Sequence, residues 1–122
     1  MTAGDIYTIA GTGSQGVAAD GTPALSAALT PWDQAVDAAG NLIFYDSGVN
    51  KIRVIPATTG IYYGIHMTAD HVYSIVGGGT GSLGDGGPGR QATINFVFGL
   101  AANGRGLAFT DQVSDRVRMI LR

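Results

Sequence analysis

Residues 1–11 of the chain read MTAGDIYTIAG, and residues 67–77 repeat this stretch as MTADHVYSIVG, 66 positions further on. Three more pairs of segments match in the same order, now 65 positions apart: Asp20–Pro23 with Asp85–Pro88, Leu42–Asp46 with Leu107–Asp111, and Lys51–Ile55 with Arg116–Ile120. Four matches in one order, with a single-residue deletion between them, indicate a duplicated unit. We predict two repeats, at about 1–66 and about 67–122, the second of which stops short of its final residues.

The composition favours short strands over helices. The chain has 20 Gly in 122 residues, only 13% of its residues are charged, and all of its nine acidic residues are Asp. Lys51 is the only lysine, so the usual surface helix formers Glu and Lys are almost missing, which argues against a helical bundle. Aromatic and β-branched residues, interrupted by Gly, Asn and Asp, instead predict short strands and tight turns.

Charge and cysteine content exclude several classes of function. A net charge of -2 argues against a strongly basic nucleic-acid-binding protein and against a polybasic membrane surface. The chain has no cysteine, which excludes disulfides and thiolate metal sites. No apolar run approaches the 18 residues of a membrane span. We expect neither a nucleic-acid nor a membrane partner; the compartment stays open, with an extracellular bacterial location as the expectation from the Arg-rich, Lys- and Glu-poor composition.

Each repeat divides into four short strands. With their counterparts in parentheses, the expected strands are Ile6–Ala10 (Val72–Val76), Gln34–Asp37 (Gly99–Ala102), Leu42–Tyr45 (Leu107–Thr110) and Lys51–Ile55 (Arg116–Ile120). Several are almost continuously apolar, which suits sheets covered on both faces. Four-stranded antiparallel sheets packed face to face around an axis are the blades of a propeller. The expected fold class is all-β, with two four-stranded antiparallel propeller blades and at most one helical turn, at Ala24–Leu29.

The residues around the inner strands resemble an NHL repeat. Repeat 1 reads AVDAAGNL at 35–42 and YDSGVNKIR at 45–53, close to the family pattern AVDxxGNL followed by ADTGNxRIR. IYTIAG at 6–11 and GDGGP at 84–88 resemble the outer strand and the loop after it. The resemblance weakens in repeat 2. The family has a Gly before the first inner strand; repeat 1 has Trp32-Asp33-Gln34 at this place, whereas repeat 2 has the Gly, as Gly99. The resemblance implies a propeller, usually of six blades. Members of the family bind proteins, RNA or glycans or act as lyases, so the resemblance predicts the fold better than the function.

Acidic and basic residues recur together in both repeats. Asp46 with Arg53 returns as Asp111 with Arg118. A catalytic acid beside an electrostatic Arg is one interpretation of each pair. We favour a structural ion pair, because an active site has no need to be copied into every repeat.

The other polar candidates are interpreted as structural too. Asp20 and Asp85 lie in matching Gly-rich loops, where Asp beside Gly typically hydrogen-bonds the turn, and no ladder of Asp residues supplies the oxygens of a calcium site. His66 and His71 are not at helical ligand spacing and have no Glu beside them. No nucleophile with a base and an acid is recognisable. We therefore expect no catalytic residues, no metal site and no cofactor.

Trp32, Asp33 and Gln34 form the candidate ligand-binding site. The only tryptophan precedes an inner strand, near the face on which propellers usually bind ligands, and a ring beside two polar side chains can stack on a sugar. The alternative is that Trp32 packs against the neighbouring blade, as its counterpart Val97 would. Tyr62 and Tyr63 lie in an insertion that we interpret as a lengthened hairpin covering a blade edge, with a binding loop as the alternative.

The function expected from these observations is a non-enzymatic NHL-type propeller module that serves as a binding scaffold for a protein or glycan partner. Carbohydrate binding through Trp32 is the alternative function, and a metal-dependent lyase-type enzyme is the third.

The order of the strands predicts self-assembly. The outer strand Ile6–Ala10 has no partner strand in its own chain, and Arg116–Ile120 ends the second blade with an open edge. Propellers hide such edges by ring closure, so we expect strand exchange between chains, which joins Ile6, Tyr7, Thr8, Ile9 and Ala10 to Arg116, Val117, Arg118, Met119 and Ile120. A homotrimer of six blades is the expected ring, and a tetramer of eight is the alternative.

Overall fold

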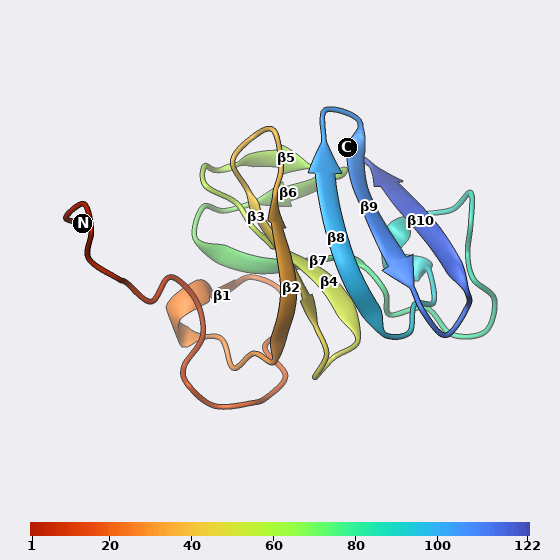
Figure 1. The fold of residues 1–122 in the computed structure, drawn as a ribbon, viewed down its shortest axis with the longest axis horizontal. Helices are drawn as coiled ribbons and strands as arrows, with labels where there is room; N and C mark the ends of the chain where they lie inside the picture. The colour runs from red at the N-terminus through yellow and green to blue at the C-terminus, as the bar shows by residue number, and fades with distance from the viewer.

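The computed structural model describes all 122 residues, and its architecture consists of antiparallel β-sheets (Figure 1). The largest sheet has the strand order β1-β7-β4-β3-β2. Its strands are β1 (Thr22–Pro23), β2 (Pro31–Val36), β3 (Leu42–Asp46), β4 (Lys51–Ile55) and β7 (His71–Val76). With 40% of the residues in strands and 5% in helical turns, the expected all-β class is confirmed.

The pairing of β4 with β7 joins the two repeats. β7 belongs to the start of repeat 2, yet it lies antiparallel to β4 of repeat 1, in the register Ile52↔Val76, Arg53↔Ser74 and Val54↔Tyr73. The shift between Ile52 and Arg53 leaves one extra residue on β7, as in a β-bulge. The prediction that Val72–Val76 closes on Lys51–Ile55 is confirmed.

The second sheet has only three main strands. β8 (Val97–Asn103), β9 (Gly106–Asp111) and β10 (Arg116–Leu121) follow one another in the order β8-β9-β10. They correspond to β2, β3 and β4 of the first sheet. β10 pairs with β9 along one edge, from Arg116↔Asp111 to Leu121↔Gly106, and no strand lies along its other edge.

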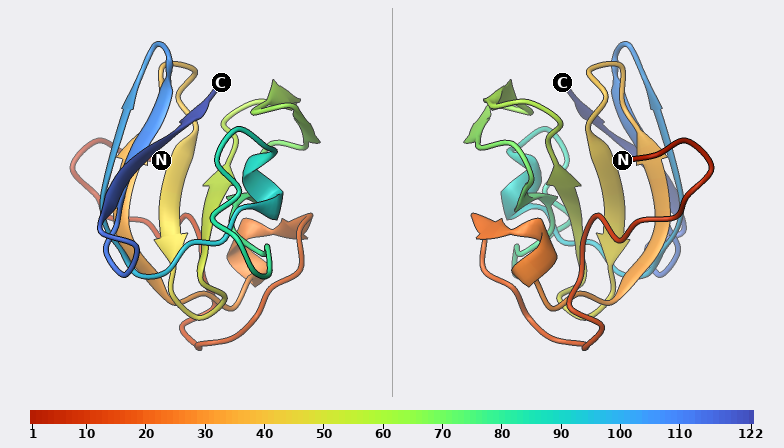
Figure 2. Two further views of the ribbon diagram at one scale, coloured as in Figure 1. Left: turned by 90° about the vertical axis from the view of Figure 1, so that its right-hand side faces the viewer. Right: turned by 90° about the vertical axis from the view of Figure 1, so that its left-hand side faces the viewer.

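The N-terminal segment forms no strand. Ile6–Ala10, expected to be one, extends away from both sheets (Figure 1). The physical reason is the absence of a neighbouring strand in the chain, because a strand needs hydrogen-bonding partners for its backbone. Residues 24–29 contain the expected helical turn, η1 (Ala24–Ser26), and repeat 2 has a matching turn, η2 (Gly89–Gln91). Figure 2 shows both turns on the same side of the molecule, away from β8.

The insertion between β4 and β7 is a hairpin, as expected. β5 (Gly60–Tyr62) pairs with β6 (Ile65–Met67). Tyr63 and Gly64 between them both have positive φ, +52° and +75°, which is the backbone of a tight two-residue turn matched to the twist of a hairpin.

The main core lies between the two sheets. It contains twelve buried hydrophobic residues, from the first sheet, the β5–β6 hairpin, the loop before β8 and the second sheet: Ile43, Tyr45, Ile52, Val54, Met67, Ile75, Val76, Ala92, Ile94, Val97, Leu107 and Phe109. A smaller cluster covers the opposite face of the first sheet and comprises Ala24, Ala27, Leu29, Phe44, Ile55 and Val72. β8 runs beside β2, so the first strands of the two sheets are neighbours (Figure 1).

Candidate functional site

Arg53 on β4 forms an ion pair inside the first sheet. Its side chain is buried, and its Nη1 donates to Oδ2 of Asp46 at 3.3 Å. Its Nη2 donates to Oδ1 of Asp20 at the same distance. The other oxygen of Asp46 accepts the backbone N–H of Thr30 at 3.1 Å, which ties the loop before β2 to the end of β3. The expected ion pair of Asp46 with Arg53 is present, and its purely structural role stays a prediction.

Asp20 receives further donors from both sides. The backbone N–H and the hydroxyl of Ser74 on β7 donate to its Oδ1 at 3.0 and 2.9 Å. Arg90 donates to its Oδ2 at 2.9 Å. Asp20 thus holds the loop of repeat 1 against β4 and β7 together.

Arg118 on β10 repeats the arrangement in the second sheet. It donates to Asp111 at 2.9 Å and to Asp85 at 2.9 and 3.0 Å. It also donates to the carbonyl oxygens of Thr93 and Leu83 at 2.7 and 2.8 Å. Asp85, the counterpart of Asp20, has no other hydrogen-bond partner, and its side chain is 63% exposed. No strand lies beside β10, so Asp85 has no donor equivalent to Ser74 of β7.

A cavity of about 480 Å³ lies at this place. One wall is the outer edge of β10, from Arg118 to Leu121, and the other is the Gly-rich loop from Gly84 to Gly89. In the first sheet the corresponding loop lies on β7 through the two pairs of β1, Thr22↔Val72 and Pro23↔His71. The cavity therefore occupies the position that a fourth strand takes in the first sheet.

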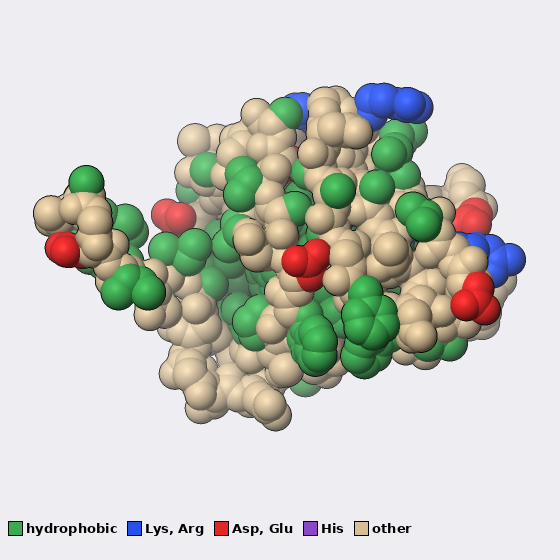
Figure 3. Space-filling model, in the orientation of Figure 1, with side chains coloured by type: hydrophobic (Ala, Val, Ile, Leu, Met, Phe, Trp, Pro, Cys, Tyr) green, Lys and Arg blue, Asp and Glu red, His purple; other side chains and the backbone are tan.

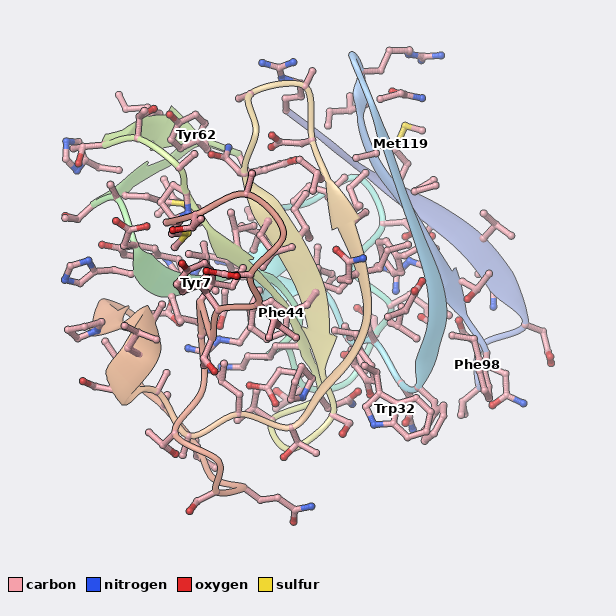
Figure 4. The ribbon with its side chains drawn as sticks, turned by 60° about the vertical axis from the view of Figure 1, so that its left-hand side comes forward. Tyr7, Trp32, Phe44, Tyr62, Phe98 and Met119 are labelled. Atoms are coloured by element: carbon pink, nitrogen blue, oxygen red, sulfur yellow. The ribbon has the colours of Figure 1, made fainter.

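Three aromatic rings form a second surface where the two sheets meet. Trp32 contacts Phe96 edge-to-face, with ring centroids 5.7 Å apart, and Phe96 contacts Phe98 at 5.0 Å. Trp32 and Phe98 are about half exposed, at 52% and 55%. Figure 4 shows these two side by side at the same end of β2 and β8, and Figure 3 shows hydrophobic side chains gathered there with an acidic side chain nearby. We call Trp32, Phe96 and Phe98 the aromatic surface.

The polar neighbours of Trp32 differ in what they contact. β2 begins at Pro31, so Trp32, Asp33 and Gln34 all lie on the strand and not in a loop before it. Asp33 accepts the backbone N–H of Leu100 on β8 at 2.7 Å and so links the two sheets. Gln34 is exposed and makes no side-chain hydrogen bond. Trp32 packs on Phe96 of the second repeat and is otherwise about half exposed. The packing interpretation is therefore supported, and ligand binding by Trp32 stays a prediction.

Phe96 and Phe98 are site residues that the sequence interpretation does not include. The sequence does place two aromatic residues two positions apart, but Phe96 lies just before β8, so the alternation of side chains along a strand does not apply to it. Phe96 has a φ of +58°, which is unusual for a bulky residue, and this backbone turns its ring toward Trp32.

The two histidines have different surroundings. His66 is exposed on β6, opposite Ile61 of β5. A ring nitrogen of His71 lies 2.7 Å from the carbonyl oxygen of Ala69, in the turn before β7. No group of three or more His, Cys, Asp or Glu side chains has the geometry of a metal site. No helix is long and apolar enough to cross a membrane.

The tyrosines of the hairpin are held by hydrogen bonds. Tyr63 donates to Oδ2 of Asp37 at 3.0 Å, and burial, with Asp37 as the second cause, raises the pKa of its hydroxyl. The Tyr62 hydroxyl contacts Thr58. Both rings are partly buried and pack against the main core.

Comparison of the chain with protein-family models, with curated proteins and with solved structures gives no match. The internal duplication supplies the reference for the site, because repeat 1 can be compared with repeat 2 residue by residue.

Proposed function

We propose that the chain is a two-repeat module of an NHL-type β-propeller, a non-enzymatic binding scaffold that associates with copies of itself into a closed ring. The observation that carries this proposal is the difference between the two sheets. β2, β3, β4 and β7 run in the strand order of a propeller blade, whereas β8, β9 and β10 repeat only the first three strands. We infer that a second copy of the chain supplies a fourth strand to the second sheet.

The exposed apolar residues support closure. Val117 and Met119 on the open edge and Ile6 and Ile9 in the N-terminal segment are exposed, and covering such surface contributes about 25 cal/mol per Å². Propellers of typically four to eight blades cover these positions by closing into a ring. Two repeats per chain allow only even totals, so three copies give six blades and four copies give eight.

Light scattering on the purified chain tests the proposal. We expect a mass three times the 12.5 kDa of one chain, or four times if the ring has eight blades. A stable species of 12.5 kDa would contradict it.

Carbohydrate binding is the second candidate function, and the aromatic surface favours it. Free faces of Trp32 and Phe98 suit stacking on the C–H face of a sugar, and the side chain of Gln34 has donors and an acceptor for its hydroxyls. In a ring built from copies, this surface would recur once per chain, which raises avidity for a ligand with several sugar units.

A glycan array separates this candidate from a scaffold that binds protein only. Specific hits should disappear in Trp32→Ala and persist in Ile61→Ala, a matched loss of an exposed apolar side chain on the β5–β6 hairpin. An array without hits, or hits that Trp32→Ala leaves unchanged, would contradict carbohydrate binding at this surface.

A further inference from the structure

We propose that residues 4–11 of one chain occupy the open edge of β10 in a second copy, in the register that β7 takes on β4, and that Thr8 there completes the Asp85–Arg118 ion pair. This inference rests on the proposed ring and specifies the interface that closes it. The occupant is a second copy of this chain, because the segment that fits the edge is this chain's own repeat of β7.

The register follows from the duplication. Residues 6–10 correspond to Val72–Val76, 66 positions later, and β10 corresponds to β4, 65 positions earlier. Transferring the observed pairs of β4 with β7 gives Val117↔Ala10, Arg118↔Thr8 and Met119↔Tyr7.

The burial of corresponding residues shows what is missing at the edge. Ile52 and Val54 on β4 are fully buried, at 0% exposure, because β7 and the second sheet lie against them. Their counterparts on β10, Val117 and Met119, are 76% and 44% exposed. Apolar side chains that are buried in one repeat and open to water in the other indicate a surface that a partner covers.

The N-terminal segment has the complementary property. Ile6 and Ile9 are 97% and 55% exposed, whereas their counterparts Val72 and Ile75 on β7 are both at 0%. Figure 1 places this segment and β10 at opposite sides of the molecule, so the segment does not lie on the β10 edge of its own chain. The contact is head-to-tail between copies, and such contacts close into a ring when the rotation permits.

The polar groups match as well as the apolar ones. In the first sheet, Ser74 gives Asp20 two hydrogen bonds, from its backbone N–H and from its hydroxyl. Thr8, the counterpart of Ser74, carries the same two donors. Asp85 carries the same acceptors and has only Arg118 as a partner. The register above places Thr8 opposite Arg118, and therefore beside Asp85.

The segment already has the local structure of β7 at both ends. The N–H of Thr2 donates to the hydroxyl of Tyr7 at 2.9 Å, as the N–H of Thr68 donates to Tyr73 at 3.0 Å. The turn residue Gly4 has positive φ, as Asp70 has before β7. This agreement lowers the conformational entropy that pairing would cost.

The exit from the segment is equally conserved between the repeats. The N–H of Gly11 donates to the carbonyl of Ala24 at 2.9 Å, as the N–H of Gly77 donates to that of Gly89 at 3.0 Å. The chain therefore continues from the N-terminal segment into the loop of repeat 1 in the same way as it continues from β7 into the loop of repeat 2.

A designed disulfide tests the register directly, because the chain has no cysteine of its own. We expect Ala10→Cys with Val117→Cys to give covalent trimers on non-reducing gels after mild oxidation, since opposed strand residues lie about 4.5–5.5 Å apart at Cα, within disulfide range. Ala10→Cys with Leu121→Cys is the matched control. Its second cysteine lies four residues along the same strand, about 13 Å away, and should leave most of the protein uncross-linked.

A second variant tests the apolar contact without altering the folded chain. Ile6→Asp places a charge on a side chain that is exposed in the single chain, and we expect it to reduce the mass in solution to 12.5 kDa. Ile61→Asp, also exposed but outside the interface, should leave the ring intact.

The outcomes separate the two proposals. An unmodified chain that stays at 12.5 kDa would overturn the ring and this inference together. A ring that survives Ile6→Asp and shows no difference between the two cysteine pairs would overturn the strand exchange and leave the scaffold standing. Selective linking by the Ala10–Val117 pair, with loss of the ring in Ile6→Asp, supports the inference.

Discussion

Arg53 shows how strongly a single residue can hold the first sheet together. Its buried guanidinium joins Asp46 to Asp20, so three elements meet at one charge. We expect Arg53→Ala to lower the free energy of unfolding by about 3–5 kcal/mol, because it leaves the buried Asp46 carboxylate without a positively charged partner. Arg90→Ala is the control: Arg90 is half exposed and also contacts Asp20, and its loss should cost less than about 1 kcal/mol. Urea unfolding at one fixed chain concentration measures both, and equal losses would contradict the expectation.

Tyr63 makes stability depend on alkaline pH. Burial first, and then Asp37, raise the pKa of its hydroxyl above the ordinary 10.0. Above about pH 10 the unfolded chain loses this proton while the folded chain keeps it, so the free energy of unfolding falls as pH rises. We expect a smaller fall in Tyr63→Phe than in the unmodified chain. Unfolding curves between pH 8 and 11 measure both slopes, and identical slopes would contradict this assignment.

Single residues differ in how far the sequence reveals their role. The pairing of Arg53 with Asp46 can be predicted because the duplication repeats both residues at one spacing. The contact of Trp32 with Phe96 cannot, because it depends on the positive φ of Phe96, and no sequence pattern specifies that conformation for a bulky residue.

At the scale of elements, the loop before β8 is fixed by close backbone contacts. A Cβ at Gly79 would overlap the backbone carbonyl oxygen of Gln91, so the loop has no room for a side chain there. We expect Gly79→Ala to lower the free energy of unfolding by about 1–3 kcal/mol through this overlap. Gly104→Ala, in the β8–β9 turn with nothing within 4 Å, should change it by less than about 0.5 kcal/mol. Thermal unfolding of the two variants makes the comparison, and an unchanged midpoint for Gly79→Ala would contradict the close packing.

Strands are predictable where their partners lie in the same chain. The bounds of β4 agree with the sequence expectation, and those of β3 and β10 extend it by one residue, because each pairs with a neighbouring strand of the same chain. Ile6–Ala10 has the pattern of β7 but forms no strand. A residue pattern specifies which segment can pair, and the presence of a neighbour determines whether it does.

The whole molecule exposes more surface than its mass requires. A folded monomer of 12.5 kDa has about 6,200 Å² of accessible surface, whereas this chain has 6645 Å². The extended N-terminal segment and the open edge of β10 contribute to the difference. Head-to-tail contact between copies would cover both surfaces, because the N-terminal segment of one copy lies on the β10 edge of the next.

Removing the segment and returning it as a peptide tests this account at the scale of the assembly. Deleting Met1–Ala10 should dissolve the ring, or lead to aggregation through the bare edge of β10, because the deleted chain keeps an acceptor and has no strand to donate. A peptide of residues 1–11 should then bind the deleted chain with one peptide per chain, since it carries Thr8 and both isoleucines of the interface. The same peptide with Ile6→Asp and Ile9→Asp should not bind. Calorimetric titration gives the stoichiometry, and a deleted chain that still forms the ring would show that other contacts hold the copies together.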